Sequence, residues 1–291
     1  MATRTIRLSI IVENQNRTNL VSGESTVRIL EKIKPATRQR GGKMDKLVVL
    51  VTGGSRDIGG ATARMLATQG HSGIVSYLKS EREARALVEE IANADGKAIA
   101  VAGDVADHED VKRIFETGRQ HFGNVSAVVH CASPNPIPEP FGAFTWLTQE
   151  AHWQTQVHGA FNCVQCAIPD MLTAQSGAFV FLGSISTDGV PPVQQTPYIV
   201  AKSALTALAR TLASEYGPKG LRTNTVSPGM TYTEMIANIP EKTKMLAKTH
   251  PPLRRLGHPE EVAETIAFRL GSGARHITGQ NLRVCGGAVM V

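Results

Sequence analysis

The chain has 291 residues and a formal net charge of +6, with 42% hydrophobic and 19% charged residues. This composition is ordinary for a folded domain with a large core. The positive excess lies in residues 1–43, which hold nine Lys and Arg against three acidic residues, so the remainder is formally neutral. The neutral charge of residues 44–291 gives no support for nucleic-acid binding. The sequence contains no run of about 18 apolar residues, so no membrane span is predicted.

The first 43 residues differ from the rest. We expect a basic N-terminal extension over 1–43 and a single α/β domain over 44–291. The extension fits three interpretations: a targeting leader, a basic arm, or a start upstream of the true initiator Met44. The expected location is the cytoplasm, or an organelle if the extension is a leader.

From Met44 onward, short apolar runs alternate with segments of helical period. Strands are expected over 46–54, 73–78, 97–105, 125–133, 177–184, 220–229 and 280–287. Helices are expected over 58–68, 81–93, 107–122, 147–174, 198–216 and 260–270. Strict alternation predicts right-handed crossovers and one doubly wound, Rossmann-type parallel sheet of seven strands with helices on both faces. The ligand crevice of such a sheet lies at the carboxyl ends of its strands.

The four cysteines are too few and too scattered for a disulfide framework. Cys163 and Cys166 form a C-x-x-C within an apolar helical stretch, where they are expected to be small buried side chains. A zinc or redox site would need a second pair of ligands, and the sequence contains none, so no metal is predicted.

A glycine-containing turn, TGGSRDIG at 52–59, lies directly between the first strand and the first helix. Gly53 permits the tight turn, Gly59 lets the helix pack closely on the sheet, and backbone N–H groups at the helix start can bind a pyrophosphate. Asp57 adds bulk and charge where a glycine would let phosphates approach, and its side chain is expected to point to solvent. The cofactor contacts predicted in this turn are Gly53, Ser55, Arg56, Ile58 and Gly59.

The residues after the second strand indicate the type of nicotinamide cofactor. An NAD enzyme of this fold carries an acid there to bind the ribose hydroxyls, whereas residues 76–80 read SYLKS. Arg56 and Lys79 are both placed to reach a 2′-phosphate. The sequence therefore favours NADP(H), with two solvated surface cations as the alternative interpretation.

Three residues form a candidate catalytic group. Tyr198 and Lys202 are four residues apart at a helix start and so share one face. An ammonium beside a phenol stabilises the phenolate and is expected to bring the tyrosine pKa toward neutrality. Ser184 ends the fifth strand at the crevice edge, where its hydroxyl can bond a substrate carbonyl oxygen.

These features together resemble the short-chain dehydrogenase/reductase family from Met44 to the end of the chain, and above all its 3-oxoacyl-[acyl-carrier-protein] reductase branch. The matching stretches are TGGSRDIG (52–59), GDVAD (103–107), GSIS (183–186), YIVAK (198–202), NTVSPGMTYTEM (224–235), PLRRLGHPEEVA (252–263) and ITGQNLRVCGG (277–287).

The resemblance implies roles for further residues. Asp104 and Val105 would hold the adenine, Tyr198 would be the general acid in reduction, and Lys202 would also bind the nicotinamide ribose. Pro228, Gly229 and Thr233 would contact the nicotinamide end of the cofactor. The resemblance also implies a mobile lid over 231–250 and a homotetramer, or a dimer, built on the helices at 147–174 and after Tyr198.

The chain departs from the family pattern in three places. Asn-Asn-Ala-Gly at the end of the fourth strand is replaced by HCAS at 130–133. The catalytic asparagine falls, by spacing from Phe161, on Gln156, which keeps an amide at a longer reach. One residue is inserted between Ser184 and Tyr198. His130 is expected to be a polar residue lining the crevice, with a substrate contact as the alternative.

Three functions are compatible with these residues. The first is an NADPH-dependent 3-oxoacyl thioester reductase of fatty acid biosynthesis, whose lid lysines Lys242, Lys244 and Lys248 would face an acyl carrier protein. The second is a reductase or dehydrogenase of a free ketone or alcohol such as a polyol, a steroid or a specialised metabolite, which the Pro-rich segment 134–140 favours. The third is a weakly catalytic NADP-binding sensor or subunit.

Overall fold

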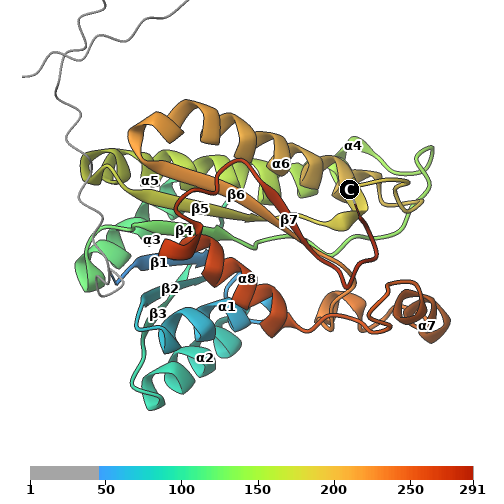
Figure 1. The fold of residues 1–291 in the computed structure, drawn as a ribbon, viewed down its shortest axis with the longest axis horizontal. Helices are drawn as coiled ribbons and strands as arrows, with labels where there is room; N and C mark the ends of the chain where they lie inside the picture. The colour runs from blue at the N-terminus through green and yellow to red at the C-terminus, as the bar shows by residue number, and fades with distance from the viewer. Residues whose placement is uncertain (1–45, 291) are drawn as a thin grey trace, which may run out of the picture. The chain divides into compact units, whose positions relative to one another are not determined.

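The structure, a computed structural model, describes residues 46–290. Its centre is a parallel sheet of seven strands in the order β3-β2-β1-β4-β5-β6-β7 (Figure 1). The strands are β1 (Val48–Thr52), β2 (Ser72–Tyr77), β3 (Lys97–Ala102), β4 (Ala127–His130), β5 (Gly177–Leu182), β6 (Leu221–Pro228) and β7 (Asn281–Val284). The strand order reverses between β1 and β4, which is where a doubly wound sheet binds its ligands. The predicted fold class is confirmed.

Helices cover both faces of this sheet. One face carries α3 (His108–Phe122), α5 (Gly159–Ala174) and α6 (Thr196–Tyr216), and the other carries α1 (Asp57–Thr68), α2 (Glu81–Asn93) and α8 (Pro259–Leu270). Successive side chains of a strand point to opposite faces. Leu50 accordingly joins the core beneath α3, α5 and α6, while Val49 and Val51 join the core beneath α1 and α8.

The helix expected over 147–174 is present and contains a widened turn. It consists of α4 (Trp146–His152), a π-helical turn η1 (Trp153–His158) and then α5. A π-helical turn holds one extra residue and shifts the helical face, and such turns are frequent at functional sites. The long helix expected here is thus present, and the widened turn within it was not predicted, because sequence periodicity does not reveal a single wide turn.

The segment between β6 and α8 contains two short helices, η4 (Glu234–Ile236) and α7 (Glu241–Thr249). This segment corresponds to residues 231–250, where the resemblance implies a lid. Its first part lies against the glycine turn, because Asp57 and Arg56 both contact Glu234.

Within residues 46–290, no helix is long and apolar enough to cross a membrane. The same residues contain no group of three or more His, Cys, Asp or Glu side chains that could hold a metal ion. The four cysteines are free, with Cys163 buried in the core and Cys166 half-buried beside it. The extension 1–43 and its boundary lie outside the described residues.

Candidate active site

The predicted catalytic residues lie at the carboxyl edge of the sheet. Ser184 follows β5, is 6% exposed, and accepts a hydrogen bond from the backbone N–H of Ser186 at 3.1 Å. Tyr198 lies in the first turn of α6. A hydrogen bond between its hydroxyl and the Ser184 side chain acts to lower the pKa of Tyr198. Lys202 follows one turn later and is 2% exposed. The fold therefore brings together Ser184, Tyr198 and Lys202 as the sequence predicts.

Burial dominates the protonation of this group. The Lys202 ammonium donates to the backbone oxygen of Leu182 at 2.7 Å and lies 5.7 Å from the centre of the Tyr198 ring. Burial lowers the pKa of Lys202 to about 8. Burial also raises the pKa of Tyr198, against the opposing effect of Ser184. The expectation that Lys202 brings the tyrosine pKa down is not met in this structure, because desolvation of the phenolate outweighs the hydrogen bond with Ser184.

Gln156 lies in η1 with its side chain fully buried. Its Nε2 lies 2.8 Å from Nδ1 of His152, the last residue of α4. The His152 ring stands edge-on to the Tyr198 ring, with centroids 6.1 Å apart and planes at 81°. Gln156 is thus linked to Tyr198, the candidate catalytic tyrosine, through His152. Sequence reasoning missed His152, although its spacing of four from Gln156 places the two on one helical face.

His130, at the end of β4, does not line the crevice. Its side chain is 1% exposed, and its Nδ1 lies 2.9 Å from the Thr52 hydroxyl at the end of the neighbouring β1. Burial, with a smaller effect of the Lys202 charge, lowers the pKa of His130 to about 3. The ring is therefore a neutral support between two strands. The expectation of a crevice-lining residue was wrong because a side chain at this register points into the core.

The glycine turn has the geometry that a dinucleotide requires. Gly53 has φ +58°, and a Cβ there would stand 2.9 Å from the backbone of Ala132. A Cβ on Gly59 would collide with the backbone of Gly53. Ser55 and Ile58 lie in the same strand-to-helix turn, at the positions where free N–H groups open α1. Only glycine fits at Gly53 and Gly59, and the absence of side chains there keeps the backbone open for a pyrophosphate.

Asp57 and Arg56 contact Glu234, in the segment between β6 and α8. Asp57 has φ +51°, and its Oδ1 accepts a hydrogen bond from the backbone N–H of Glu234 at 3.0 Å. Arg56 pairs with the carboxylate of the same Glu234 at 2.8 Å. The expected solvent-pointing orientation of Asp57 was wrong: the side chain satisfies one of the free N–H groups that open η4.

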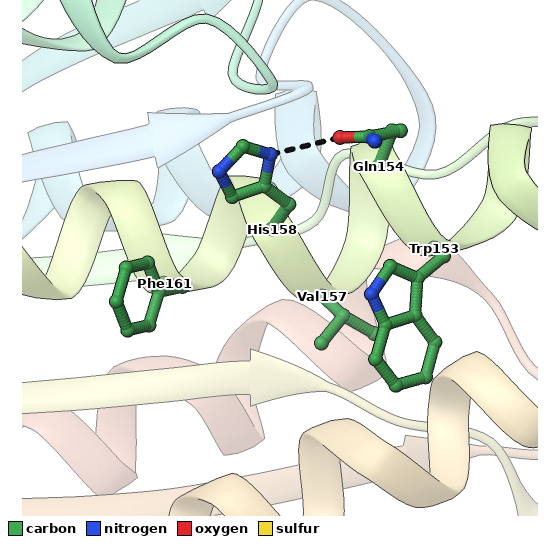
Figure 2. Close-up of a pocket in the computed structure, with 5 residues that line it drawn as sticks. All are labelled: Trp153, Gln154, Val157, His158 and Phe161. Carbon is green, nitrogen blue, oxygen red and sulfur yellow. Dashed lines mark hydrogen bonds between the residues drawn. The ribbon is translucent and has the colours of Figure 1, made fainter.

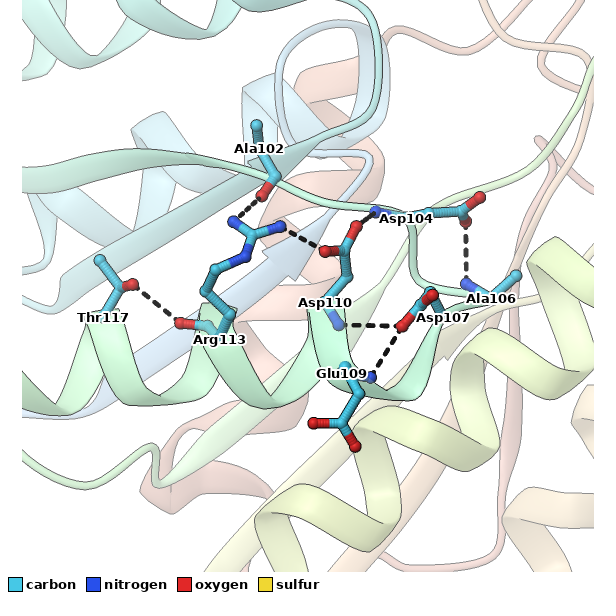
Figure 3. A network of polar contacts seen from close by, with 8 residues as sticks. All are labelled: Ala102, Asp104, Ala106, Asp107, Glu109, Asp110, Arg113 and Thr117. Carbon is cyan, nitrogen blue, oxygen red and sulfur yellow. Dashed lines mark hydrogen bonds and ion pairs between the residues drawn. The ribbon is translucent and has the colours of Figure 1, made fainter.

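A network of polar contacts holds the turn after β3 (Figure 3). Asp110 of α3 accepts from the Asp104 N–H at 2.8 Å and pairs with Arg113, which also donates to the Ala102 oxygen at 2.8 Å. Asn162 of α5 donates to the Val105 oxygen at 3.0 Å. The turn that carries Asp104 and Val105 is thus fixed from two helices.

The remaining predicted cofactor contacts lie along the same edge. Pro228 ends β6, and Gly229 donates to the Val284 oxygen at 2.9 Å, where a Cβ would stand 3.0 Å from Cys285. Thr233 precedes η4 with extended backbone. Lys79 is exposed just beyond β2, and no acidic side chain stands at that strand end. The open glycine turn together with Arg56 and Lys79 fits a phosphorylated dinucleotide.

A separate hollow lies on the outer side of the η1–α5 helix (Figure 2). It is lined by Trp153, Gln154, Val157, His158 and Phe161. Trp153 and Phe161 are 40% and 46% exposed, whereas Gln156 and His152 of the same helical run are buried beside the catalytic group. The hollow is therefore distinct from the candidate active site.

Comparison with known proteins places this chain in a family. A family model described as enoyl-(acyl carrier protein) reductase matches residues 53–289. The 3-oxoacyl-[acyl-carrier-protein] reductase FabG of Staphylococcus aureus is 33% identical over 83% of this chain and 97% of its own length. L-rhamnose 1-dehydrogenase (NAD(P)(+)) of Azotobacter vinelandii is 35% identical over 84% and 96%, respectively.

Solved structures agree. A blue fluorescent protein from a metagenomic library, in complex with NADPH, has a TM-score of 0.78 and 30% identity, with 84% of this chain and 98% of that chain covered. A dehydrogenase/reductase from Sinorhizobium meliloti has a TM-score of 0.78 at 27% identity, with 84% and 95% covered. The chain belongs to the short-chain dehydrogenase/reductase family. It is an NAD(P)-dependent oxidoreductase acting on CH–OH or C=O groups.

Proposed function

We propose that the chain is an NADPH-dependent carbonyl reductase whose substrate is a 3-oxoacyl thioester. The observation that carries the proposal is the assembly of Ser184, Tyr198 and Lys202 at the carboxyl edge, next to the glycine turn. The similarity to FabG of Staphylococcus aureus supports the thioester substrate.

NADP(H) is the cofactor. Arg56 and Lys79 supply cations for the 2′-phosphate, and residues 76–80 lack the acid that NAD enzymes place there. The similar blue fluorescent protein, whose solved structure contains NADPH, supports the same choice of cofactor. The turn holding Asp104 and Val105 would receive the adenine, and Pro228, Gly229 and Thr233 would border the nicotinamide. When bound, NADPH supplies the hydride.

The residues of the chain supply the proton and hold the carbonyl. The Ser184 hydroxyl bonds the carbonyl oxygen and so orients the substrate. Tyr198 donates its proton to that oxygen as negative charge develops on it. The Lys202 ammonium stabilises the resulting phenolate, a role that strengthens as the charge forms in a site of low dielectric. The buried Gln156 amide and His152 complete the polar path behind Tyr198.

The test is NADPH oxidation with an acetoacetyl thioester, measured for the wild type beside Tyr198→Phe. We expect turnover by the wild type and a loss of at least about a hundredfold in the variant, which keeps the ring but lacks the acid. A wild type that binds NADPH yet oxidises it with no carbonyl compound would instead indicate the sensor or subunit function.

A second candidate is the reduction of a free ketone, or the oxidation of a free alcohol. The similarity to L-rhamnose 1-dehydrogenase favours it. The charges of α7 also weaken the argument for an acyl carrier protein as partner. Lys244 and Lys248 both lie within 3.8 Å of Glu241, so part of their charge is neutralised within the helix. A panel of ketones and polyols beside the thioester separates the two candidates by relative kcat/KM.

A homotetramer is the proposed assembly. Its support is the exposed apolar side of the η1–α5 helix, where Trp153 and Phe161 border the hollow of Figure 2. Val200 on α6 is 42% exposed as well. Isolated apolar side chains on a surface are common, but a group of aromatic residues around a hollow is typical of an interaction site.

A further inference from the structure

Two proline-rich loops border the candidate active site. The first loop, residues 131–145, joins β4 to α4 and holds four prolines between positions 134 and 140. The second loop, residues 188–195, joins the short helix η2 (Ile185–Thr187) to α6 and holds two adjacent prolines. Because η2 begins directly after Ser184 and the first turn of α6 holds Tyr198, the second loop starts and ends beside the candidate catalytic group.

Two contacts hold the second loop in place. Near its start, Arg283 of β7 donates to the Asp188 carboxylate at 2.7 Å, and both side chains are mostly buried. Near its end, the backbone N–H of Glu139 in the first loop donates to the backbone oxygen of Gln194 at 3.0 Å. Each proline fixes its own φ and so reduces the freedom of the chain between these contacts. The two loops are therefore joined to one another and to the sheet.

The side chains between these contacts are apolar and exposed. Residues 189–193 read GVPPV, in which Val190 is 95% and Val193 84% exposed. Ile137 and Phe141, which flank Glu139 in the first loop, are 72% and 74% exposed. Apolar side chains gathered on neighbouring loops are typical of a ligand-binding or interaction site. Because these loops adjoin the candidate catalytic group, the substrate itself is the ligand that they can reach.

We infer that these two loops determine substrate specificity and receive an aliphatic chain attached to the carbonyl that is reduced. Val190, Val193, Ile137 and Phe141 offer only hydrocarbon surface, on which an aliphatic chain is removed from water. The hydroxyls of a polyol would lose water there without gaining a hydrogen bond. The inference rests on the proposed carbonyl reductase function. It narrows the substrate to a carbonyl compound with a chain of several carbons, either a thioester or a free ketone.

The test measures kcat/KM on two pairs of substrates that differ in chain length. One pair is the acetoacetyl and 3-oxooctanoyl thioesters of N-acetylcysteamine, and the other is 2-butanone and 2-octanone. A fully buried methylene contributes up to about fourfold, so partial burial of the roughly four added methylenes predicts a gain of at least about tenfold. We expect this gain in the wild type for at least one pair.

The double variant Val190→Ser with Val193→Ser removes the apolar surface of the second loop. Both side chains are exposed, so the substitutions should hardly change stability. We expect the gain with chain length to fall below about threefold, because the added methylenes then meet a polar surface. Phe268→Ser is the matched control: Phe268 is a half-exposed apolar side chain on α8, and this variant should keep the full gain.

Each outcome decides the inference. A gain with chain length that the double variant loses supports it, on whichever pair of substrates it is found. Equal kcat/KM for short and long substrates in the wild type, or a gain that the double variant keeps, overturns it and leaves the reductase function in place. A double variant that changes only the mass measured by light scattering also overturns it, because the loops would then join copies of the chain. A wild type that binds NADPH but reduces no thioester or ketone overturns the proposed function and this inference with it.

Discussion

Lys202 is a buried charge with a single backbone acceptor, the Leu182 oxygen, and its surroundings explain its lowered pKa. Burying an ammonium costs free energy unless it is paired. Enzymes accept such a cost where the group must respond to charge that develops in the transition state. At the scale of single residues, the site thus combines the charged Lys202 with two neutral histidines, His130 and His152.

Lys202→Met tests this cost. The pKa of Lys202 is about 8 in the folded state against 10.5 for the free side chain. The unfolded chain therefore binds more protons between these values, and wild-type stability should rise as the pH increases from about 8 to 10.5. The Met variant should lack that rise and gain at most about 3 kcal/mol at pH 7, while losing activity.

The measurement is urea denaturation of both proteins at several pH values. A Met variant that is less stable than the wild type at pH 7 would show that the bond to Leu182 outweighs the desolvation of the ammonium. Unfolding is followed without cofactor, so any effect of the substitution on NADPH binding does not enter the comparison.

At the scale of elements, the glycine turn is joined to the segment between β6 and α8 by two contacts to one residue, Glu234. Asp57 binds the backbone of Glu234, and Arg56 binds its carboxylate. Arg56 is also a proposed ligand of the 2′-phosphate. Glu234 and the phosphate therefore compete for one guanidinium.

Glu234→Gln should tighten NADPH binding, because it removes the carboxylate and leaves the main-chain contact to Asp57 in place. Exposed ion pairs contribute about 0.2–1 kcal/mol, so we expect the dissociation constant to fall about two- to fivefold. NADH, which has no 2′-phosphate, is the control ligand and should bind as before. An equal change for both cofactors would contradict competition at Arg56.

The start of α3 is a second element whose stability can be tested. Asp107 precedes the helix, and its carboxylate accepts from the N–H groups of Glu109 and Asp110 at 2.8 and 3.1 Å. Asp107→Ala should cost about 1 kcal/mol of unfolding free energy, the usual effect of losing such a cap. Glu109→Ala is the control, because its exposed pair with Lys112 contributes little.

At the scale of the whole molecule, the described domain has an active edge and an apolar helical side. The active edge is formed by loops after β1, β3, β5 and β6, and the apolar side by η1, α5 and α6. Because η1 contributes Gln156 to the first and Trp153 to the second, assembly through that side would hold the active-site helix in place.

Phe161→Glu tests the assembly. A carboxylate in the middle of an apolar interface is costly to desolvate, so we expect the mass measured by light scattering to fall from that of a tetramer to that of a smaller species. Glu264→Ala, on α8, is a control that should leave the mass unchanged. A wild type that is monomeric at all concentrations would contradict the proposed assembly.

The sequence by itself determined the order of the elements, the parallel sheet, the glycine turn and the candidate catalytic group. These depend on local signals: the period of apolar residues, the steric need for glycine at Gly53, and the four-residue spacing of Tyr198 and Lys202. Such signals act within a few residues of one another. For this reason they can be read without knowing what lies across the fold.

Only the tertiary structure decided the remaining features. The widened turn at η1, the place of His152 beside Tyr198, the enclosure of His130 and the contact of Asp57 with Glu234 each join parts of the chain through packing. Asp57 and Glu234 are 177 residues apart. The physical reason is that burial and hydrogen-bond partners are properties of the folded surroundings, and neither the period nor the identity of a residue specifies them.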